Sequence, residues 1–312
     1  MKKLFVLVVC LTIMGIQSVN AQAAIAMLHH EGNVNMFSSA QAAIDNSVDG
    51  DTIYLSEGMF GEFTINKGIA VIGSGMKTII APNVNIDGSG IYLNNVSVSN
   101  LAIVNNILFI GSNSAIQNVK FQQCKISGNC LFNIYTVRTE FNMCHIQGQM
   151  VLNPDGTNDL SVINCKINEV HNGGESLGTV NFTNCNIKSI PQTFSYSERN
   201  NYINCIVESL MQGSFKNCLY RNEYDDSEAG CYRIDCYTSP DFTLDKNLEC
   251  SLTDEQLSAA GYLGTDGTVV GITGGATPFT LASSVLRITD HNIEVDNEQR
   301  KLKVTLTLGT EE

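Results

Sequence analysis

The sequence contains no tryptophan, few prolines and few basic residues. It has 5 prolines in 312 residues but many asparagines, serines, threonines and glycines, a balance typical of many short strands and turns. The absence of tryptophan weakens the case for a strong carbohydrate-stacking platform. Lysine and arginine total 18 against 31 acidic residues, and the net charge of -13 argues against nucleic acid and anionic membrane surfaces as partners.

Long apolar runs are also missing after the first twenty residues. The chain starts with two lysines, an apolar stretch from Leu4 to Ile16 and small residues at Val19 and Ala21, which is the pattern of a secretory signal peptide. We therefore expect residues 1–21 to be cleaved and the mature protein to be secreted, extracellular, at the cell surface or in the periplasm. No later segment reaches the roughly 20 apolar residues of a transmembrane helix, so no membrane span is expected.

A repeat of about 20 residues runs through the middle of the chain. Six segments align without gaps around a cysteine that has an apolar residue three positions before it and another two positions after it. These cysteines are Cys124, Cys144, Cys165, Cys185, Cys205 and Cys218. A second column with the same period consists of Cys130, Met150, Val170, Ile190 and Leu210. Two columns with one period predict stacked coils of two or three short strands.

Alternation inside each repeat predicts which side chains face the core. The cysteine and the apolar residue two positions later should point inward, whereas the residues between them, such as Lys125, His145 and Lys166, should point outward. Asparagines precede four of the cysteines, and we expect these amides to hydrogen bond from coil to coil. They are Asn164, Asn184, Asn204 and Asn217.

The same stacking predicts the state of the cysteines. Neighbours in a column lie within disulfide distance, but their parallel Cβ directions do not suit a bridge. We therefore expect five of them to be buried free thiols: Cys124, Cys144, Cys165, Cys185 and Cys205. Cys231 and Cys236 lie off the repeat and are either free or joined by a local disulfide.

Segments at both ends of the mature chain resemble the pectin-lyase-like right-handed β-helix class. Phe37-Ser-Ser-Ala-Gln-Ala-Ala-Ile44 and Gly50-Asp-Thr-Ile-Tyr-Leu55 are similar to the opening of that family, where a short helix covers the core. The glycine-rich stretch 264–275 resembles the closing segment of many secreted bacterial members. The resemblance implies an all-β, single-stranded right-handed parallel β-helix of about nine coils, with a short N-terminal capping helix and a C-terminal β cap. Neither segment is specific to one function.

A leucine-rich repeat is the alternative fold, because its units also run about 20–29 residues and carry asparagine or cysteine at one position. Its Phe-x-x-Cys subtype places the next apolar residue three positions after the cysteine, whereas here the apolar residue falls two positions after it. The strand-rich first 120 residues also fit that fold poorly. We therefore prefer the β-helix.

The sequence suggests no independent second domain. We expect a signal peptide, an N-terminal cap, the β-helix and a closing region at residues 1–21, 22–50, 51–238 and 239–312. Short helices are expected near Ser38–Asn46 and Thr253–Ala260. Two alternating strands should end the chain, near Asn292–Val295 and Leu302–Leu308, and should protect the open end of the solenoid from edge pairing.

The catalytic motifs of the family's enzymes are not found. The polygalacturonase pattern is represented only by Asp225-Asp226 and by Arg233-Ile-Asp235, which departs from it at the third position. The coils between residues 119 and 207 contain almost no aspartate for a calcium-dependent lyase, and no esterase pattern of two aspartates and an arginine is visible. We therefore predict no catalytic residue, no metal site and no cofactor.

The densest group of acidic and aromatic residues follows the last repeat. Aromatic faces beside carboxylates suit the stacking and hydrogen bonding of sugars. The candidate ligand-binding residues are Tyr220, Glu223, Tyr224, Asp225, Asp226 and Arg233. The structural alternative is that this group only packs or solvates the frayed end of the solenoid.

These observations favour a monomeric, non-enzymatic extracellular or cell-surface protein that binds glycans or other surface polymers. One alternative is a polysaccharide lyase or glycoside hydrolase with a divergent site. The other is a structural or adhesive rod, since the fold alone does not decide among these classes.

Overall fold

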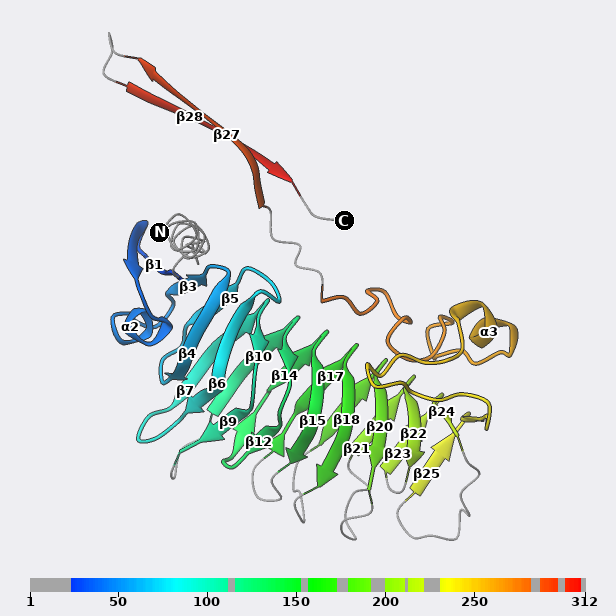
Figure 1. Cartoon of the computed structure of the whole chain (residues 1–312). Helices are drawn as coiled ribbons and strands as arrows, with labels where there is room; N and C mark the ends of the chain where they lie inside the picture. Colours follow the sequence, from blue (N-terminus) through cyan, green and yellow to red (C-terminus); the bar gives the residue numbers. More distant parts are fainter. Residues whose placement is uncertain are drawn as a thin grey trace, which may run out of the picture.

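The protein is a right-handed parallel β-helix, as the repeat and the family resemblance predicted. The computed structural model describes residues 24–111, 116–152, 157–172, 179–191, 200–210, 213–221, 231–281, 287–296 and 301–309. Figure 1 shows the coils stacked side by side along one axis, with the N-terminal cap at one end. The expected signal peptide, residues 1–21, lies outside the described residues.

An antiparallel hairpin and a short helix form the N-terminal cap. Strands β1 (Ala26–His30) and β2 (Asn33–Phe37) pair with each other, and β1 also pairs antiparallel with the first solenoid strand, β3 (Thr52–Leu55). Helix α2 (Ala40–Asp45) confirms the predicted capping helix, and the Ser39 hydroxyl, as N-cap, accepts a hydrogen bond from the Ala42 N–H. The helix buries Ala40, Ala43 and Ile44 against the core.

Two parallel sheets make up the walls of the solenoid. The first sheet continues from β3 through β5 (Ala70–Gly73), β7 (Leu93–Ser99), β10 (Ile116–Gln122), β14 (Glu140–Asn142), β17 (Leu160–Ile163), β19 (Val180–Thr183), β21 (Asn200–Ile203), β23 (Gly213–Lys216) and β25 (Cys231–Ile234). Two short strands, β13 (Thr136–Val137) and β16 (Thr157–Asn158), extend the row of β10. Each step in this order is a parallel pairing between consecutive coils.

The second sheet contains the strands that follow each turn. Its members are β4 (Gly58–Ile65), β6 (Thr78–Asp87), β8 (Ala102–Ile103), β9 (Ile107–Ile110), β11 (Lys125–Ile126), β12 (Cys130–Phe132), β15 (His145–Leu152), β18 (Lys166–Asn172), β20 (Asn186–Ile190), β22 (Ile206–Leu210), β24 (Leu219–Tyr220) and β26 (Tyr237–Thr238). The solenoid has about seven turns, slightly fewer than the nine expected.

The pairing register of the strands confirms that the two predicted columns of side chains point into the core. Phe182, Tyr202 and Phe215 stack with ring centroids 4.7 and 4.6 Å apart, and they occupy one position in three consecutive coils. The five cysteines predicted to be buried thiols are all fully buried and free. Their Sγ atoms donate to backbone carbonyls of their own coil and of the preceding coil, as Cys165 does to Ile163 and Phe141.

The cysteine column is longer than the spacing indicated. Cys236 was assigned to a position off the repeat, but β24 pairs in register with β26, so Cys236 directly follows Cys218 in the column. The Cys236 thiol donates to Ile234, as the other thiols do to the residue two positions earlier. Cys236 is a free thiol, so the alternative of a disulfide to Cys231 is not formed.

The residue before each of these cysteines has a left-handed backbone. The φ angles of Asn164, Asn184, Asn204 and Asn217 are 49°, 52°, 55° and 49°. Asparagine tolerates this region better than most residues because its short polar side chain can hydrogen bond locally. The turn between the two sheets explains why asparagine recurs there.

The expectation that these amides hydrogen bond from coil to coil is wrong for Asn164, Asn204 and Asn217. The amides of these three residues instead bind residues 239–281, which we call the closing segment. The Nδ2 atom of Asn164 donates to the carbonyl of Thr277, and the Nδ2 atom of Asn217 donates to Leu263 at 3.5 Å. The closing segment therefore runs beside this turn of the coils, as Figure 1 shows for the orange chain.

The closing segment also builds a second, smaller core. Helix α3 (Asp254–Ala259) confirms the predicted helix and begins with a capping box of Thr253 and Gln256. Leu257, Phe242 and Val270 pack against Ile206 and Leu219, which stand at the outward position directly after the cysteines. The outward column is thus polar at Lys125, His145, Lys166 and Asn186 and becomes apolar at Ile206 and Leu219, which belong to this second core.

A terminal β-hairpin is present, formed by β27 (Arg287–Asp296) and β28 (Lys301–Gly309). Among the described strands it forms a two-stranded sheet of its own and pairs with neither solenoid sheet. In Figure 1 it stands away from the coils. The protection of the solenoid end that we expected from it is therefore not made by strand pairing.

Candidate functional site

The two edges of the solenoid differ in what covers them. The asparagine turns form one edge, and the closing segment lies along it. The opposite edge is where strands of the second sheet lead back into the first sheet, as between β6 and β7. A cavity of about 700 Å³ opens on this second edge, next to the N-terminal cap.

Three successive coils line the cavity. Its walls come from the segments that enter β3, β5 and β7, which are residues 49–51, 66–70 and 91–95. Gly68 lets the second and third of these coils approach, because a Cβ there would lie 2.4 Å from the Asn94 carbonyl oxygen. The Oδ1 atom of Asp49 accepts a hydrogen bond of 2.8 Å from the Gly68 N–H. The cavity is therefore fixed by backbone contacts between coils.

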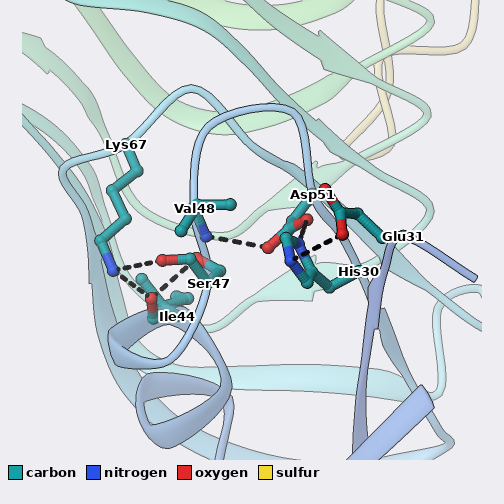
Figure 2. A network of polar contacts seen from close by, with 7 residues as sticks. All are labelled: His30, Glu31, Ile44, Ser47, Val48, Asp51 and Lys67. Atoms are coloured by element: carbon teal, nitrogen blue, oxygen red, sulfur yellow. Dashed lines mark hydrogen bonds and ion pairs between the residues drawn. The ribbon is translucent and has the colours of Figure 1, made fainter. Parts of the chain in front are cut away.

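Lys67, in the wall of the cavity, has a structural role. Its ammonium group donates to the carbonyls of Ile44, Asp45 and Ser47 at 2.9, 2.9 and 2.7 Å, at the end of helix α2. A cation is well placed there because the last carbonyls of a helix carry partial negative charge. Figure 2 shows Lys67 pointing at the carbonyls of Ile44 and Ser47. Lys67 thus joins the N-terminal cap to the cavity wall.

Asp51 is held by the cap as well. Its carboxylate accepts from the Val48 N–H at 2.8 Å and lies 2.7 Å from Nδ1 of His30, as Figure 2 shows. Burial alone would raise the pKa of this carboxyl. The Val48 N–H, the hydrogen bond from His30 and the charges of His30 and His29 outweigh burial and hold the pKa below its ordinary value of 3.8. Asp51 is therefore ionised at neutral pH and engaged within the protein.

The exposed residues of the cavity include three amide side chains, one aromatic ring, Ile91 and Asp49. Tyr92 has 74% of its surface exposed, the highest value among the exposed large hydrophobic side chains that the structure describes. Asn66, Asn94 and Asn95 are exposed beside it, and Oδ1 of Asn94 accepts a hydrogen bond of 2.6 Å from Nδ2 of Asn118 in the next coil. An exposed ring beside orientated amides can stack on a sugar and hydrogen bond its hydroxyl groups.

The structure describes two of the six candidate residues predicted from the sequence. Glu223, Tyr224, Asp225 and Asp226 lie outside the described residues. Tyr220 and Arg233 are brought together, with Cζ of Arg233 5.0 Å from the centroid of the Tyr220 ring. Both occupy inward positions of the last coils, because Tyr220 pairs with Val207 and Arg233 pairs with Phe215. This pair closes the end of the aromatic core.

Sequence reasoning missed the cavity, because its residues come from three coils that precede the regular repeat. The available signal was Ile91-Tyr92, two large apolar residues that directly precede an alternating strand, followed by two asparagines. Ile91 and Tyr92 are exposed, although Leu93 at the start of β7 is buried.

Within the part of the chain that the structure describes, no group of three or more histidine, cysteine, aspartate or glutamate side chains is arranged to hold a metal ion. The helices described are all too short or too polar to cross a membrane.

Comparisons with known proteins assign neither a family nor a function to the chain. No protein-family model matches the sequence, and no curated protein matches it. Among solved structures, the chain is similar to the pectin methylesterase from Aspergillus niger in its deglycosylated form. The two are 14% identical, the match covers 68% of this chain and 85% of that chain, and the TM-score is 0.33. A likeness of this degree transfers neither residues nor activity to this chain.

Proposed function

We propose that this protein is a non-enzymatic glycan-binding β-helix of the cell exterior, and that its ligand binds in the cavity at Tyr92. The observation that supports the proposal is an exposed aromatic ring beside exposed amides in a cavity of about 700 Å³, with walls fixed by three coils. Small-ligand sites in proteins are typically concave and pre-formed, with a few orientated polar groups. The predicted export of the chain would place this surface where glycans are found.

The charges of the cavity favour a neutral sugar. Asp49 and Asp51 line it, and the single ammonium group among its lining residues, on Lys67, is directed at the carbonyls of helix α2. A uronate would bring its carboxylate close to these two acids, and like charges repel. We therefore propose neutral pyranose glycans as ligands, and a protein that acts as a monomer.

The hydrogen bonds that Asp49 and Asp51 make within the protein are consistent with binding without cleavage. Sugar hydrolysis needs two carboxyl groups facing one bond about 5–10 Å apart. Asp49 already accepts from the Gly68 N–H, and Asp51 accepts from the Val48 N–H and pairs with His30. Both carboxylates therefore hold the backbone of the cavity walls in place.

A glycan array with the mature protein, followed by product analysis on every hit, tests the proposal. We expect neutral glycans to bind, uronates to bind less, and the chain length of each hit to stay unchanged. Release of shorter products would establish the lyase or hydrolase alternative. The absence of binding to any glycan would favour a structural rod.

Matched variants locate the site. Tyr92→Ala should weaken binding of the array hits about 3–10-fold, the range expected for one aromatic contact. Tyr54→Ala is the control, because Tyr54 is also exposed, at 44%, but does not line the cavity. The earlier candidate at the far end is tested in parallel with Arg233→Lys: loss of binding in this variant but not in Tyr92→Ala would move the site there.

A further inference from the structure

A second exposed tyrosine lies in line with Tyr92 along the solenoid axis. Leu93, Ile116 and Thr136 are register partners in three consecutive coils, and Tyr92 and Tyr135 each directly precede the first and third of these residues. The Tyr135 carbonyl accepts a hydrogen bond of 3.1 Å from the Ile116 N–H, which confirms this alignment. The two tyrosines therefore occupy equivalent positions two coils apart.

Both rings are on the outside of the solenoid. Tyr92 is 74% exposed and Tyr135 is 41% exposed, whereas Leu93 and Thr136, the residues that follow them, are buried. Adjacent parallel strands lie about 4.8 Å apart, so the two positions are separated by roughly 9–10 Å along the axis. A pyranose ring in an extended glycan advances the chain by about one such strand spacing.

Side-chain amides accompany the tyrosines from coil to coil. Asn94 pairs in register with Gln117, and each makes a side-chain hydrogen bond with the coil that follows it. Asn118 donates to Asn94 at 2.6 Å, and Nη2 of Arg138 donates to Oε1 of Gln117 at 3.1 Å. These contacts hold polar groups in a row parallel to the line that joins the two tyrosines.

We propose that an extended glycan lies parallel to the solenoid axis on this edge, with about one sugar ring per coil. One ring stacks on Tyr92 in the cavity, and the second ring beyond it stacks on Tyr135, while the amide row binds the hydroxyl groups between them. This inference rests on the proposed function and adds to it the direction of the ligand and the number of subsites. It identifies the ligand as a linear glycan of at least three pyranose rings.

Chain-length dependence of binding tests the inference. Calorimetric titration would use neutral oligosaccharides of one to six units from the series that binds in the array. In the wild-type protein, affinity should rise up to about three units and then level off. Tyr135→Ala should leave the affinity for mono- and disaccharides unchanged and lower that for trisaccharides and longer chains about 3–10-fold. Tyr92→Ala should lower the affinity at every length.

Two variants control for folding. Tyr135→Phe keeps the ring and should bind as the wild type does, and Tyr54→Ala removes an exposed tyrosine outside the row. Equal losses at every length in Tyr135→Ala would overturn the assignment of one ring per coil. An unchanged affinity in Tyr135→Ala together with loss in Tyr92→Ala would overturn the extended row but leave the proposed function intact. No binding of any oligosaccharide by the wild type would overturn both.

Discussion

Asn204 binds Thr265 through both ends of its side-chain amide. Its Oδ1 atom accepts from the Thr265 N–H at 2.8 Å, and its Nδ2 atom donates to the Thr265 hydroxyl at 3.3 Å. Asn186, one coil earlier and on the outward column, likewise accepts from the Ile272 N–H and donates to the Leu248 carbonyl. Side-chain amides of the coils thus give the closing segment the hydrogen bonds that a neighbouring strand would otherwise provide.

Replacing Asn204 should therefore loosen the closing segment. Asn204→Gly keeps the left-handed backbone, with φ of 55°, free of strain, and removes both amide bonds. We expect a loss of about 1–3 kcal/mol in the free energy of unfolding and faster proteolysis near Thr265. Asn100→Gly is the control, because Asn100 has the same backbone conformation, with φ of 57°, in an earlier coil. Equal losses in the two variants would show that the amide bonds to Thr265 contribute nothing.

The glycines of the closing segment should differ in their tolerance of alanine. Gly267 and Gly271 have φ angles of 78° and 89°, so alanine is strained at both. A Cβ at Gly267 meets nothing within 4 Å, whereas one at Gly271 lies 2.6 Å from Oδ1 of Asn186 and 2.7 Å from Cδ1 of Ile206. Gly267→Ala should cost about 1 kcal/mol of unfolding free energy, and Gly271→Ala should cost at least about 1–2 kcal/mol more. Chemical denaturation measures both, and similar costs would contradict the close approach.

The buried thiols of the cysteine column should be inert in the folded protein. Burial raises the pKa of the Cys124, Cys165 and Cys205 thiols, so the reactive thiolate is scarce. We expect iodoacetamide to modify the half-buried Cys236 and Cys250 first. In denaturant without reductant, all the column cysteines should react within the same assay. Mass mapping that finds any of them in a disulfide would contradict the column of free thiols.

His145 should make the protein less stable in acid. Burial, followed by the charges of Lys166 and Lys125, lowers its pKa from 6.5 to about 4. The unfolded chain therefore takes up a proton below about pH 6.5 that the folded protein binds only near pH 4. Stability should fall by about 1–3 kcal/mol between these values and change little above them. His145→Gln removes this group, so the difference between the two melting curves should vanish above pH 7 and grow toward pH 4. A constant difference would show that His145 is accessible to protons when folded.

His30 should have the opposite effect on the pH dependence of stability. The hydrogen bond to Asp51 raises the pKa of His30 above 6.5, despite partial burial, and the charges of Asp51 and Glu31 add to this rise. The contribution of His30 to the stability of the fold is therefore present below pH 6.5 and is lost as pH rises through the raised pKa of His30. Because the pKa of Asp51 is below 3.8, the contribution of Asp51 to stability is lost only when the pH falls below that value. His30→Gln should lower the melting temperature at pH 5.5 more than at pH 8.5, and equal losses would contradict the ion pair.

Local periodicity explains how much of the fold the sequence predicts. Cysteine and isoleucine two positions apart, repeated every 20 residues, define strands, inward columns and turns together, since only stacked coils bury both columns. Cys236 was missed because it follows Cys218 after 18 residues and has Asp235 in place of asparagine. The backbone of Asp235 is nevertheless left-handed, with φ of 51°, so the turn geometry persists where the residue type changes.

The closing segment and the cavity could not be predicted from the sequence, because both depend on contacts between segments far apart in the chain. Ile206 and Leu219 interrupt a polar outward column, but nothing in the sequence indicates which segment packs on them. The amides of Asn164 and Asn204 find their partners 113 and 61 residues later in the chain. The cavity likewise depends on the alignment of three unequal coils, which only the register shows.

The most direct test of the glycan site is a crystal structure of the protein with the tightest-binding neutral trisaccharide from the array. We predict a sugar ring packed on the exposed face of Tyr92, hydroxyl groups within hydrogen-bond distance of Asn94 or Asn95, and a chain that runs toward Tyr135. A trisaccharide bound at the opposite end near Arg233, or on the asparagine edge beside the closing segment, would contradict the account.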